Sequence, residues 1–500
     1  MRNRNPHPWR WIISTGLIIL LFCGALFASG DGGGSGGHHN PFARVFEAFF
    51  IILLLALVGR YLANKTKQSA VLGELLMGII AGGLLYMQDN PIITIIRNFD
   101  IIEEVGRLVT QKEYSYITAV DDILAESTLK PDVQTKLREL FIRPDLEEFL
   151  IISNSINFIS SLGVILLLFM VGLEISISDM KKSGKNSIIV AILGIILPFA
   201  MGYGCTLILL PDLSHSSHVF IAATLCATSI GITARVFKDL GKIQIPEAKV
   251  VLGAAVIDDV LGLIILAVVT GMVSSGNVQI SDILIILIKA VVFFGLLLWF
   301  GSALLKRSVQ LFAKFDRSHV KLIYPFALLM ICSYLADLIG LATIVGAFAA
   351  GLIIREEAFQ LKGIKGFQNN ETVEHILAPL EGVFAPVFFV VMGLQVDTSI
   401  LFTKEVLVTG GVLTLVAILG KWLASVTMPK RLNKHIIGIG MVPRGEVGLI
   451  FAGIGRGLGV LDNELFAAVI LVVLLTTLVT PPALSKMLRS YESKEPLKDQ

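Results

Sequence analysis

Charged side chains are scarce in this 500-residue chain, where they make up 16% of the sequence while hydrophobic residues make up 54%. A soluble globular protein carries about 25% charged residues. The deficit extends through the whole chain, which excludes a soluble enzyme held by a single membrane anchor. The net charge is only +2, so we expect no nucleic-acid partner.

Cysteine is also rare, and its placement excludes two further classes of protein. The four cysteines all lie inside apolar runs without paired spacing: Cys23, Cys205, Cys226 and Cys332. They are typical of small buried hydrophobic residues and indicate neither a disulfide framework nor a resident metal site.

Long apolar runs are what the sequence has in place of charge. After residue 40 there are about thirteen runs of the length that crosses a hydrocarbon core as a helix, roughly 17 to 25 residues. The loops between them alternate between rich and poor in Lys and Arg, as in Lys181-Lys182 and Lys430-Arg431 against Pro211–Ser217. Because Lys and Arg mark the cytoplasmic side, the pattern predicts an all-α polytopic protein of the inner membrane with a cytoplasmic C-terminus.

Four segments are predicted from composition. Residues 1–40 hold an apolar run, which is either a cleaved signal peptide or a retained extra span, followed by a glycine-rich linker. Residues 41–486 form the transmembrane domain, interrupted at 89–150 by a polar, helical insertion that we expect on the periplasmic side. Residues 487–500 form a short cytoplasmic tail. The insertion is interpreted as a cap without chemistry, and a docking surface is the alternative.

A weak internal repeat indicates how the spans are arranged. Gly73–Gly78 resembles Gly346–Gly351, and Met170–Ile175 resembles Val391–Val396. The copies are seven spans apart, an odd number, so they enter the membrane in opposite directions. Inverted-topology repeats build many secondary transporters, with the ion site at the midplane between the halves.

Two adjacent carboxylates, Asp258 and Asp259, lie at the centre of an apolar span. Each carboxylate at mid-bilayer costs roughly 2.5 to 3.5 kcal/mol on insertion scales, so such residues face a protein interior or water and are usually functional. Neighbouring residues point about 100° apart on a helix, so one partner cannot satisfy both. A second pair, Asp121-Asp122, lies in the polar insertion, where solvation is free, and we assign it no function.

Lys421 lies well inside another span, and its charge needs an explanation of its own. A buried lysine pairs with a carboxylate or loses its proton. An ion pair with one of the two aspartates is the natural interpretation, and snorkelling to the cytoplasmic face is the alternative.

Two spans are interrupted at matching positions of the repeat. One contains Ala227–Arg235, which is unusually polar, and the other contains Met441–Gly448, with Arg444 and Glu446 at mid-span beside Pro443. Interrupted helices in equivalent positions point to a transporter's binding site. Freed carbonyls and the hydroxyls of Thr228 and Ser229 are hard oxygen ligands for a small cation, although both hydroxyls are nearly as typical of helix packing.

These residues together resemble the cation:proton antiporter 2 family of sodium/proton exchangers. The matching motifs occur in family order over about residues 45 to 486: Gly73-Glu-Leu-Leu76, Met170-Val-Gly-Leu-Glu174, Ala227–Arg235, Ile257-Asp-Asp-Val260, Lys421 and Pro443-Arg-Gly-Glu446. The resemblance implies about 13 transmembrane helices in two inverted repeats, two crossing broken helices, a mobile core domain and a homodimer. It also implies that Asp259 is the principal ion- and proton-carrying carboxylate, that Asp258 pairs with Lys421, and that Arg444 and Glu446 support the core.

The resulting hypothesis is antiport of a monovalent cation, with Na⁺ expected, against protons, with the cation and protons competing for Asp258 and Asp259. The alternatives are a K⁺/H⁺ antiporter of the potassium-efflux type and a transport-inactive sensor on the same fold. Potassium-efflux relatives usually append a nucleotide-binding domain, and no segment here fits one. An intramembrane aspartyl protease needs its aspartates on separate spans, and its Gly-x-Gly-Asp motif is missing. We therefore predict no enzymatic activity and no cofactor beyond the transported ions.

Overall fold

The computed structural model describes most of the chain as helix. The residues described are 41–66, 70–112, 115–126, 131–174, 177–275, 288, 292–293, 295–297, 299, 301, 305, 307–314, 319–339, 343–359, 371–396, 403–445, 448, 451–452, 455 and 458–492. All regular secondary structure within these ranges is helical. The predicted all-α fold class is therefore confirmed, whereas the predicted N-terminal segment 1–40 lies outside the described residues.

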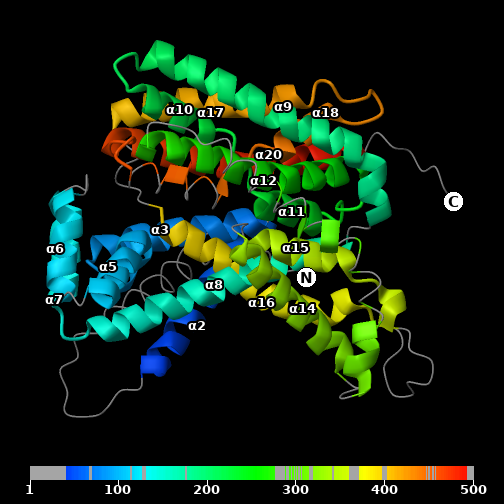
Figure 1. The fold of residues 1–500 in the computed structure, drawn as a ribbon, viewed down its shortest axis with the longest axis horizontal. Coiled ribbons are helices and arrows are strands. Elements are labelled where there is room, and N and C mark those ends of the chain that lie inside the picture. The colour runs from blue at the N-terminus through cyan, green and yellow to red at the C-terminus, as the bar shows by residue number, and fades with distance from the viewer. Residues whose placement is uncertain are drawn as a thin grey trace, which may run out of the picture. The chain divides into compact units, whose positions relative to one another are not determined.

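The chain divides into two compact units, of which the first comprises residues up to Ser160 together with Pro386–Ser399. Its complete helices are α2 (Pro41–Lys65), α3 (Ala70–Met87), α4 (Pro91–Arg97), α5 (Phe99–Lys112), α6 (Tyr116–Glu126) and α7 (Pro131–Ile142). Consecutive helices pack on one another, α2 on α3, α5 on α6 and α6 on α7 (Figure 1). The short helices α4 to α7 are the predicted polar insertion.

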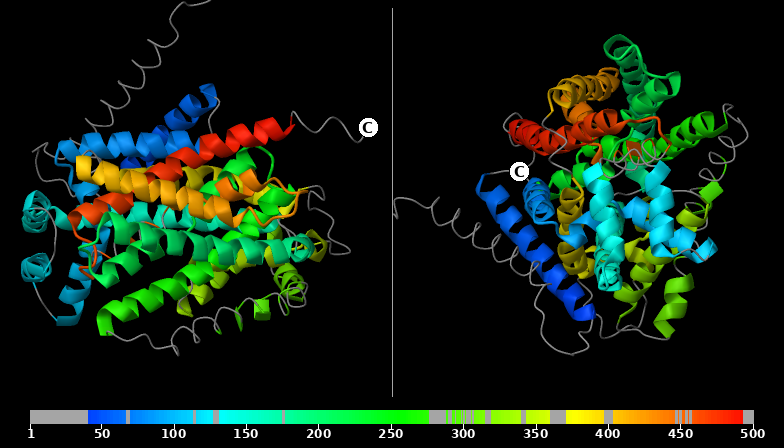
Figure 2. Two further views of the ribbon diagram at one scale, coloured as in Figure 1. Left: turned by 90° about the horizontal axis from the view of Figure 1, so that it is seen from above. Right: turned by 90° about the vertical axis from the view of Figure 1, so that its left-hand side faces the viewer.

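The second unit comprises Ser161–Ala385 and the residues from Ile400 onward. Its helices are α8 (Leu146–Glu174, from Ser161), α9 (Ile177–Leu209), α10 (His215–Thr224), α11 (Ile230–Asp239), α12 (Pro246–Ser275), α14 (Val320–Leu338), α15 (Thr343–Ile353), η2 (Glu356–Phe359), α16 (Val373–Leu394, up to Ala385), α17 (Lys404–Ala424), α18 (Lys434–Gly440) and α20 (Asn463–Glu492). Within this unit α9, α17 and α20 run side by side, as Figures 1 and 2 both show.

Eight helices among the described residues are long and apolar enough to cross a membrane: α2, α3, α8, α9, α14, α16, α17 and α20. The predicted span around residue 228 is broken into the short helices α10 and α11, and before residue 446 the described helix α18 ends at Gly440. Another of the predicted apolar runs is centred near residue 292, where only scattered residues are described. A polytopic membrane fold is thus confirmed, while the predicted number of about thirteen stays a prediction.

The two copies of the sequence repeat make matching contacts. A Cβ added at Gly78 of α3 would overlap the Val390 carbonyl oxygen and lie 3.0 Å from the Cα of Gly393 in α16. A Cβ added at Gly172 of α8 would meet Phe348 of α15 in the same way and lie 3.0 Å from the Cα of Gly351. Gly78 corresponds to Gly351 in the repeat and Gly172 to Gly393. The same glycine-on-glycine helix crossing therefore occurs once in each unit.

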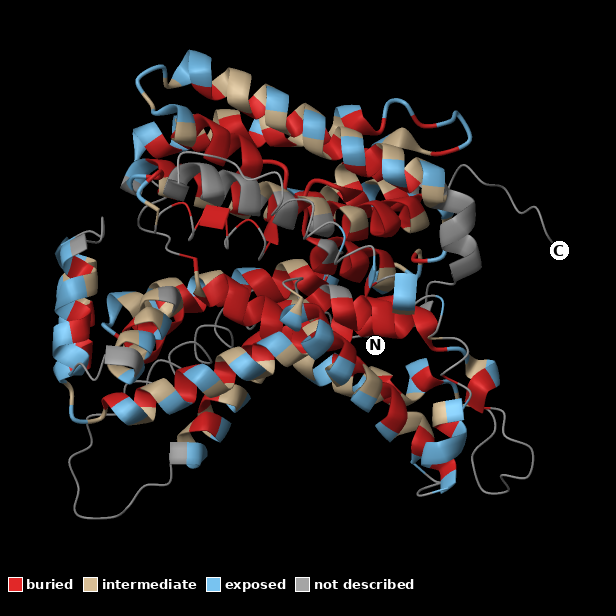
Figure 3. Ribbon diagram, viewed as in Figure 1, coloured by how far each residue is buried: buried red, intermediate tan, exposed pale blue. Residues whose placement is uncertain are grey.

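Helix α9 shows how a membrane helix divides its faces (Figure 3). Ile188, Ile192 and Ile196 are spaced by four residues and are 48%, 44% and 54% exposed. Ser187, Gly194 and Pro198 lie on the buried side. An exposed apolar stripe beside a packed stripe of small residues is what a lipid-facing helix requires, since small residues let helix backbones approach closely in a membrane.

Candidate functional site

The first part of the site is a break in one helix of the second unit. Helix α10 ends at Thr224 and α11 begins at Ile230, with Leu225–Ser229 between them. This break overlaps the start of the Ala227–Arg235 segment that the sequence singled out. All of Ala227, Thr228 and Ser229 are at least 97% buried, so the unpaired backbone groups of the break need partners inside the protein.

A second break follows α18, which ends at Gly440. Met441 caps α18, and the chain then passes through Val442 and Pro443, which lacks an N–H, to Gly445. Gly445 has a φ of +33°, and a Cβ there would overlap the hydroxyl of Ser229. A glycine is required at this position by both the backbone conformation and the close approach of the first break.

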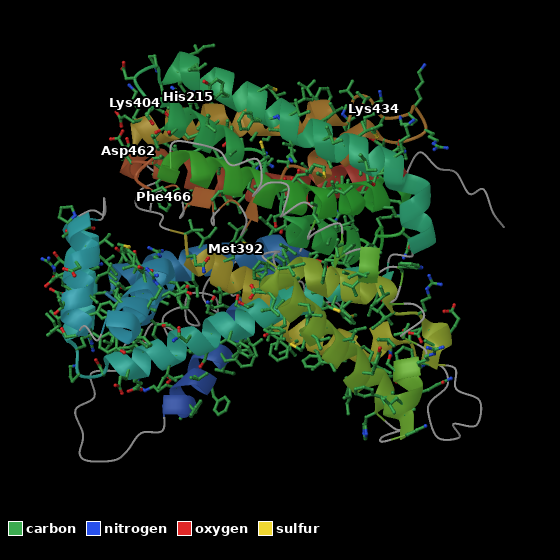
Figure 4. All side chains as sticks on the ribbon, in the orientation of Figure 1. His215, Met392, Lys404, Lys434, Asp462 and Phe466 are labelled. Carbon is green, nitrogen blue, oxygen red and sulfur yellow. The ribbon has the colours of Figure 1, made fainter. Side chains whose placement is uncertain are left out.

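The two breaks are hydrogen-bonded to each other. The Ser229 N–H donates to the Pro443 carbonyl at 2.8 Å. The Thr228 hydroxyl donates to the Met441 carbonyl at 3.4 Å. Figure 4 places His215, which starts α10, at one end of the unit and Lys434, which starts α18, at the other. The broken helices therefore enter from opposite ends, as the inverted repeat predicts, and cross at their breaks, as the family resemblance implies.

Arg444 joins the crossing to a third helix. Its guanidinium donates to the carbonyl oxygens of Val442 and Leu225, each at 2.6 Å. Two longer bonds reach the carbonyls of Met441 at 3.4 Å and of Ala417 in α17 at 3.5 Å. Arg444 is 1% exposed. One buried side chain thus binds backbone carbonyls at both breaks and links them to α17, one turn before Lys421.

The buried ion pair lies between α12 and α17. The Lys421 ammonium contacts both carboxylate oxygens of Asp258, at 3.3 Å and 3.2 Å. The side chains of Lys421 and Asp258 are 0% and 1% exposed. Lys421 therefore pairs with an aspartate and does not snorkel to the surface. Breaking a buried pair leaves an uncompensated charge, so opening this pair is costly unless another group takes the place of the lost partner.

Two of the predicted site residues, Asp259 and Glu446, have side chains that the structure does not describe. Asp259 belongs to α12, but its side chain lies outside the described part of the structure, as does Glu446. By contrast, Asp121 and Asp122 in α6 are both exposed, and Asp121 forms an ion pair with Arg138 at 2.9 Å. The two carboxylates are therefore solvated, as the sequence predicts, and their lack of function stays a prediction.

Two features of the site were missed in the sequence. The Thr233 hydroxyl donates to the Gly440 carbonyl at 2.7 Å and adds a third bond to the crossing. Arg235 of α11 binds the buried Glu381 of α16 at 2.8 Å, and Lys238 binds its second oxygen at 3.3 Å. Thr233 and Arg235 lie in the polar motif already quoted. A mid-span glutamate such as Glu381 is a signal of the same kind as Asp258 and was overlooked.

Comparison with known proteins identifies the family of this chain. The model of the sodium/hydrogen exchanger transmembrane family matches residues 52–490. The high-affinity Na⁺/H⁺ antiporter NhaS3 of Synechocystis is 37% identical over 350 residues, covering 69% of this chain and 74% of the relative. The Na⁺/H⁺-K⁺ antiporter GerN of Bacillus cereus is 32% identical over 394 residues, covering 74% and 96%.

Among solved structures, the sodium proton antiporter MjNhaP1 of Methanocaldococcus jannaschii superposes with a TM-score of 0.59 at 16% identity, covering 91% of this chain and 99% of the other. At that identity the likeness shows the fold alone. The family match over residues 52–490 and the 37% identity to NhaS3 establish that this protein belongs to the sodium/hydrogen exchanger family.

Proposed function

We propose that this protein is a secondary antiporter that exchanges a monovalent cation, chiefly Na⁺, for protons. The observation that carries the proposal is the fully buried pair of Asp258 and Lys421 next to two crossing broken helices. A titratable pair in this position can exchange one cation for another without leaving a bare charge in the protein. The relatives named as Na⁺/H⁺ antiporters support Na⁺ as the substrate.

In the proposed cycle, protons and the cation compete for the same carboxylates. With Asp259 protonated and Asp258 paired with Lys421, the site is locally neutral. Loss of protons lets the cation bind to Asp259 and Asp258, and Lys421 is then displaced. Thr228 and Ser229 hold the crossing that faces this site, and freed backbone carbonyls supply further oxygen ligands. Arg444 and Glu446 keep the breaks in register.

The membrane context belongs to the same proposal. The alternation of Lys- and Arg-rich loops supports an inner-membrane location with a cytoplasmic C-terminus. His215, which belongs to the Lys- and Arg-poor segment Pro211–Ser217, lies at one end of the second unit with Lys404 and Asp462 (Figure 4). Lys434, which follows the basic Lys430-Arg431, lies at the other end. The loop alternation in the sequence also supports a periplasmic position for the helical insertion α4 to α7, and a homodimer is expected from the family resemblance.

K⁺/H⁺ exchange is the second candidate, because one relative is named as a Na⁺/H⁺-K⁺ antiporter. Both cations prefer oxygen ligands, so the donor set alone does not separate them. A transport-inactive sensor on the same fold is the remaining alternative, and measured exchange would eliminate it.

The proposal is tested by Asp259→Asn in proteoliposomes that carry an internal pH-sensitive dye. We expect the wild type to move protons in response to added Na⁺ and the variant to lose this response. Asp122→Asn is the matched control, because it makes the same change at an exposed position. Cation-driven proton movement that survives intact in Asp259→Asn would disprove the assigned role.

A further inference from the structure

Helix α9 carries a proline in its interior, Pro198, close to the buried ion pair. Proline has no backbone N–H, so the carbonyl four residues earlier has no donor in the regular helical pattern. That carbonyl belongs to Gly194, and both Gly194 and Pro198 are buried. The helix therefore presents a backbone acceptor inside the protein that receives no hydrogen bond from the residue four positions later.

The Lys421 side chain lies directly against this part of α9. A Cβ built on Gly194 would lie 3.5 Å from Nζ of Lys421 and 3.7 Å from its Cδ. No side chain of Gly194 thus separates the ammonium from the backbone. One residue earlier, Gly420 packs on the ring of Pro198, where an added Cβ would lie 2.8 Å from the proline Cα. The proline and the lysine are therefore held in one helix contact.

The neighbouring side chains Asp258, Arg444 and Cys226 already form hydrogen bonds. The carboxylate of Asp258 already accepts two hydrogen bonds from the Lys421 ammonium. Arg444 donates to carbonyls and accepts nothing. The thiol of Cys226 contacts the neighbouring carbonyl of Ile195 at 3.4 Å. Among the described residues packed around Lys421, Gly194 offers a backbone acceptor without a donor four residues later in its helix.

We propose that the Gly194 carbonyl, left without a helical donor by Pro198, receives the Lys421 ammonium when a cation displaces it from Asp258. A buried ammonium without an acceptor is costly, and a charge-assisted hydrogen bond to a carbonyl offsets that cost. The lysine then moves between two acceptors within the protein. Gly194 and Pro198 are positioning residues, since they act on the cation site through Lys421.

This inference rests on the proposed function and is tested with Pro198→Ala, which restores an N–H and gives the Gly194 carbonyl a helical partner. Displacing Lys421 then becomes harder, so the apparent KM for Na⁺ should rise roughly tenfold, the order expected for one lost hydrogen bond to a charged group. The maximal rate should change less. The Na⁺ concentration that stabilises the purified protein against heating should rise in parallel.

Two comparisons separate this role from a general effect of the proline. Pro325→Ala makes the same change inside α14 and should leave the KM for Na⁺ unaltered. In a Lys421→Met background, Pro198→Ala should no longer shift the Na⁺ dependence of thermal stability, because the group it acts through is gone. Pro198→Gly, which also restores the N–H, serves as the second variant if the alanine variant does not fold.

An unchanged Na⁺ dependence in both Pro198 variants would overturn the inference, and so would an equal shift with and without Lys421. A wild-type protein that responds to Na⁺ in neither assay would instead overturn the proposed function itself. The two failures are therefore distinguishable.

Discussion

The charges of Lys421 and Asp258 stabilise each other, because both side chains are buried away from water. Such a pair contributes little net stability, yet the loss of one partner strands a charge in a low-dielectric interior. In an antiporter this asymmetry is useful. It prevents the pair from opening unless a cation or a proton takes over the role of the missing charge.

Asp258→Asn should therefore destabilise the protein by about 3 to 5 kcal/mol, while the double variant Asp258→Asn/Lys421→Met should recover most of that loss. Thermal melting in detergent measures both, with Asp121→Asn as the exposed control. If Asp258→Asn melts like the wild type, Lys421 has another partner or carries no charge.

Arg444 acts at the same scale by binding four carbonyls around the crossing. Lysine has a single ammonium in place of the planar fork of donors, so Arg444→Lys cannot satisfy carbonyls of both breaks and α17 together. We expect a loss of about 1 to 3 kcal/mol in stability and strongly reduced antiport. Melting and transport of Arg444→Lys equal to those of the wild type would contradict the assigned role.

Residues of this kind differ in how far a sequence reveals them. Asp258, Lys421 and Arg444 stand out because a charge in an apolar run must be explained. Gly194 and Thr233 do not, since glycine and threonine are ordinary in membrane helices and their roles depend on which helix lies opposite. Which aspartate pairs with Lys421 follows from the family resemblance, as adjacent side chains on one helix cannot be ranked by spacing.

Helices in both units cross closely at small residues. Gly78 on Gly393 and Gly172 on Gly351 bring backbones into contact in two equivalent places. The repeat that predicts this equivalence was visible in short motifs, and so were the positions of the two breaks. The lengths of the half-helices were not, because they depend on partners such as Arg444 and Ser229 that satisfy the freed backbone groups.

Gly393→Leu should destabilise the protein by at least about 1 to 3 kcal/mol, because a side chain there would overlap the backbone of α3. Gly382 provides a control in the same helix, since it is exposed and an added Cβ there would meet no atom within 4 Å. Gly382→Leu should stay within about 0.5 kcal/mol of the wild type. Equal effects of the two substitutions on thermal melting would argue against a close crossing at Gly393.

For the whole molecule, competition between protons and the cation predicts how transport depends on pH. Where the carboxylates are protonated, the apparent KM for Na⁺ should fall about tenfold per pH unit as the pH rises if one proton competes, and about a hundredfold if two compete. Two protons per cation would also move one net charge, on which the membrane potential acts by about 2.3 kcal/mol per 100 mV. A KM that does not vary with pH would contradict competition for a shared site.

The most direct test of cation/proton exchange is a cation series on the purified wild-type protein in proteoliposomes. A pH gradient is imposed, an internal dye reports the pH, and Na⁺, Li⁺ and K⁺ are added in turn between pH 6 and 9. We predict that Na⁺ dissipates the gradient and that K⁺ does so far more weakly. A response to K⁺ alone would move the protein to the potassium-exchanging alternative, and no response to any cation across this range would contradict the account.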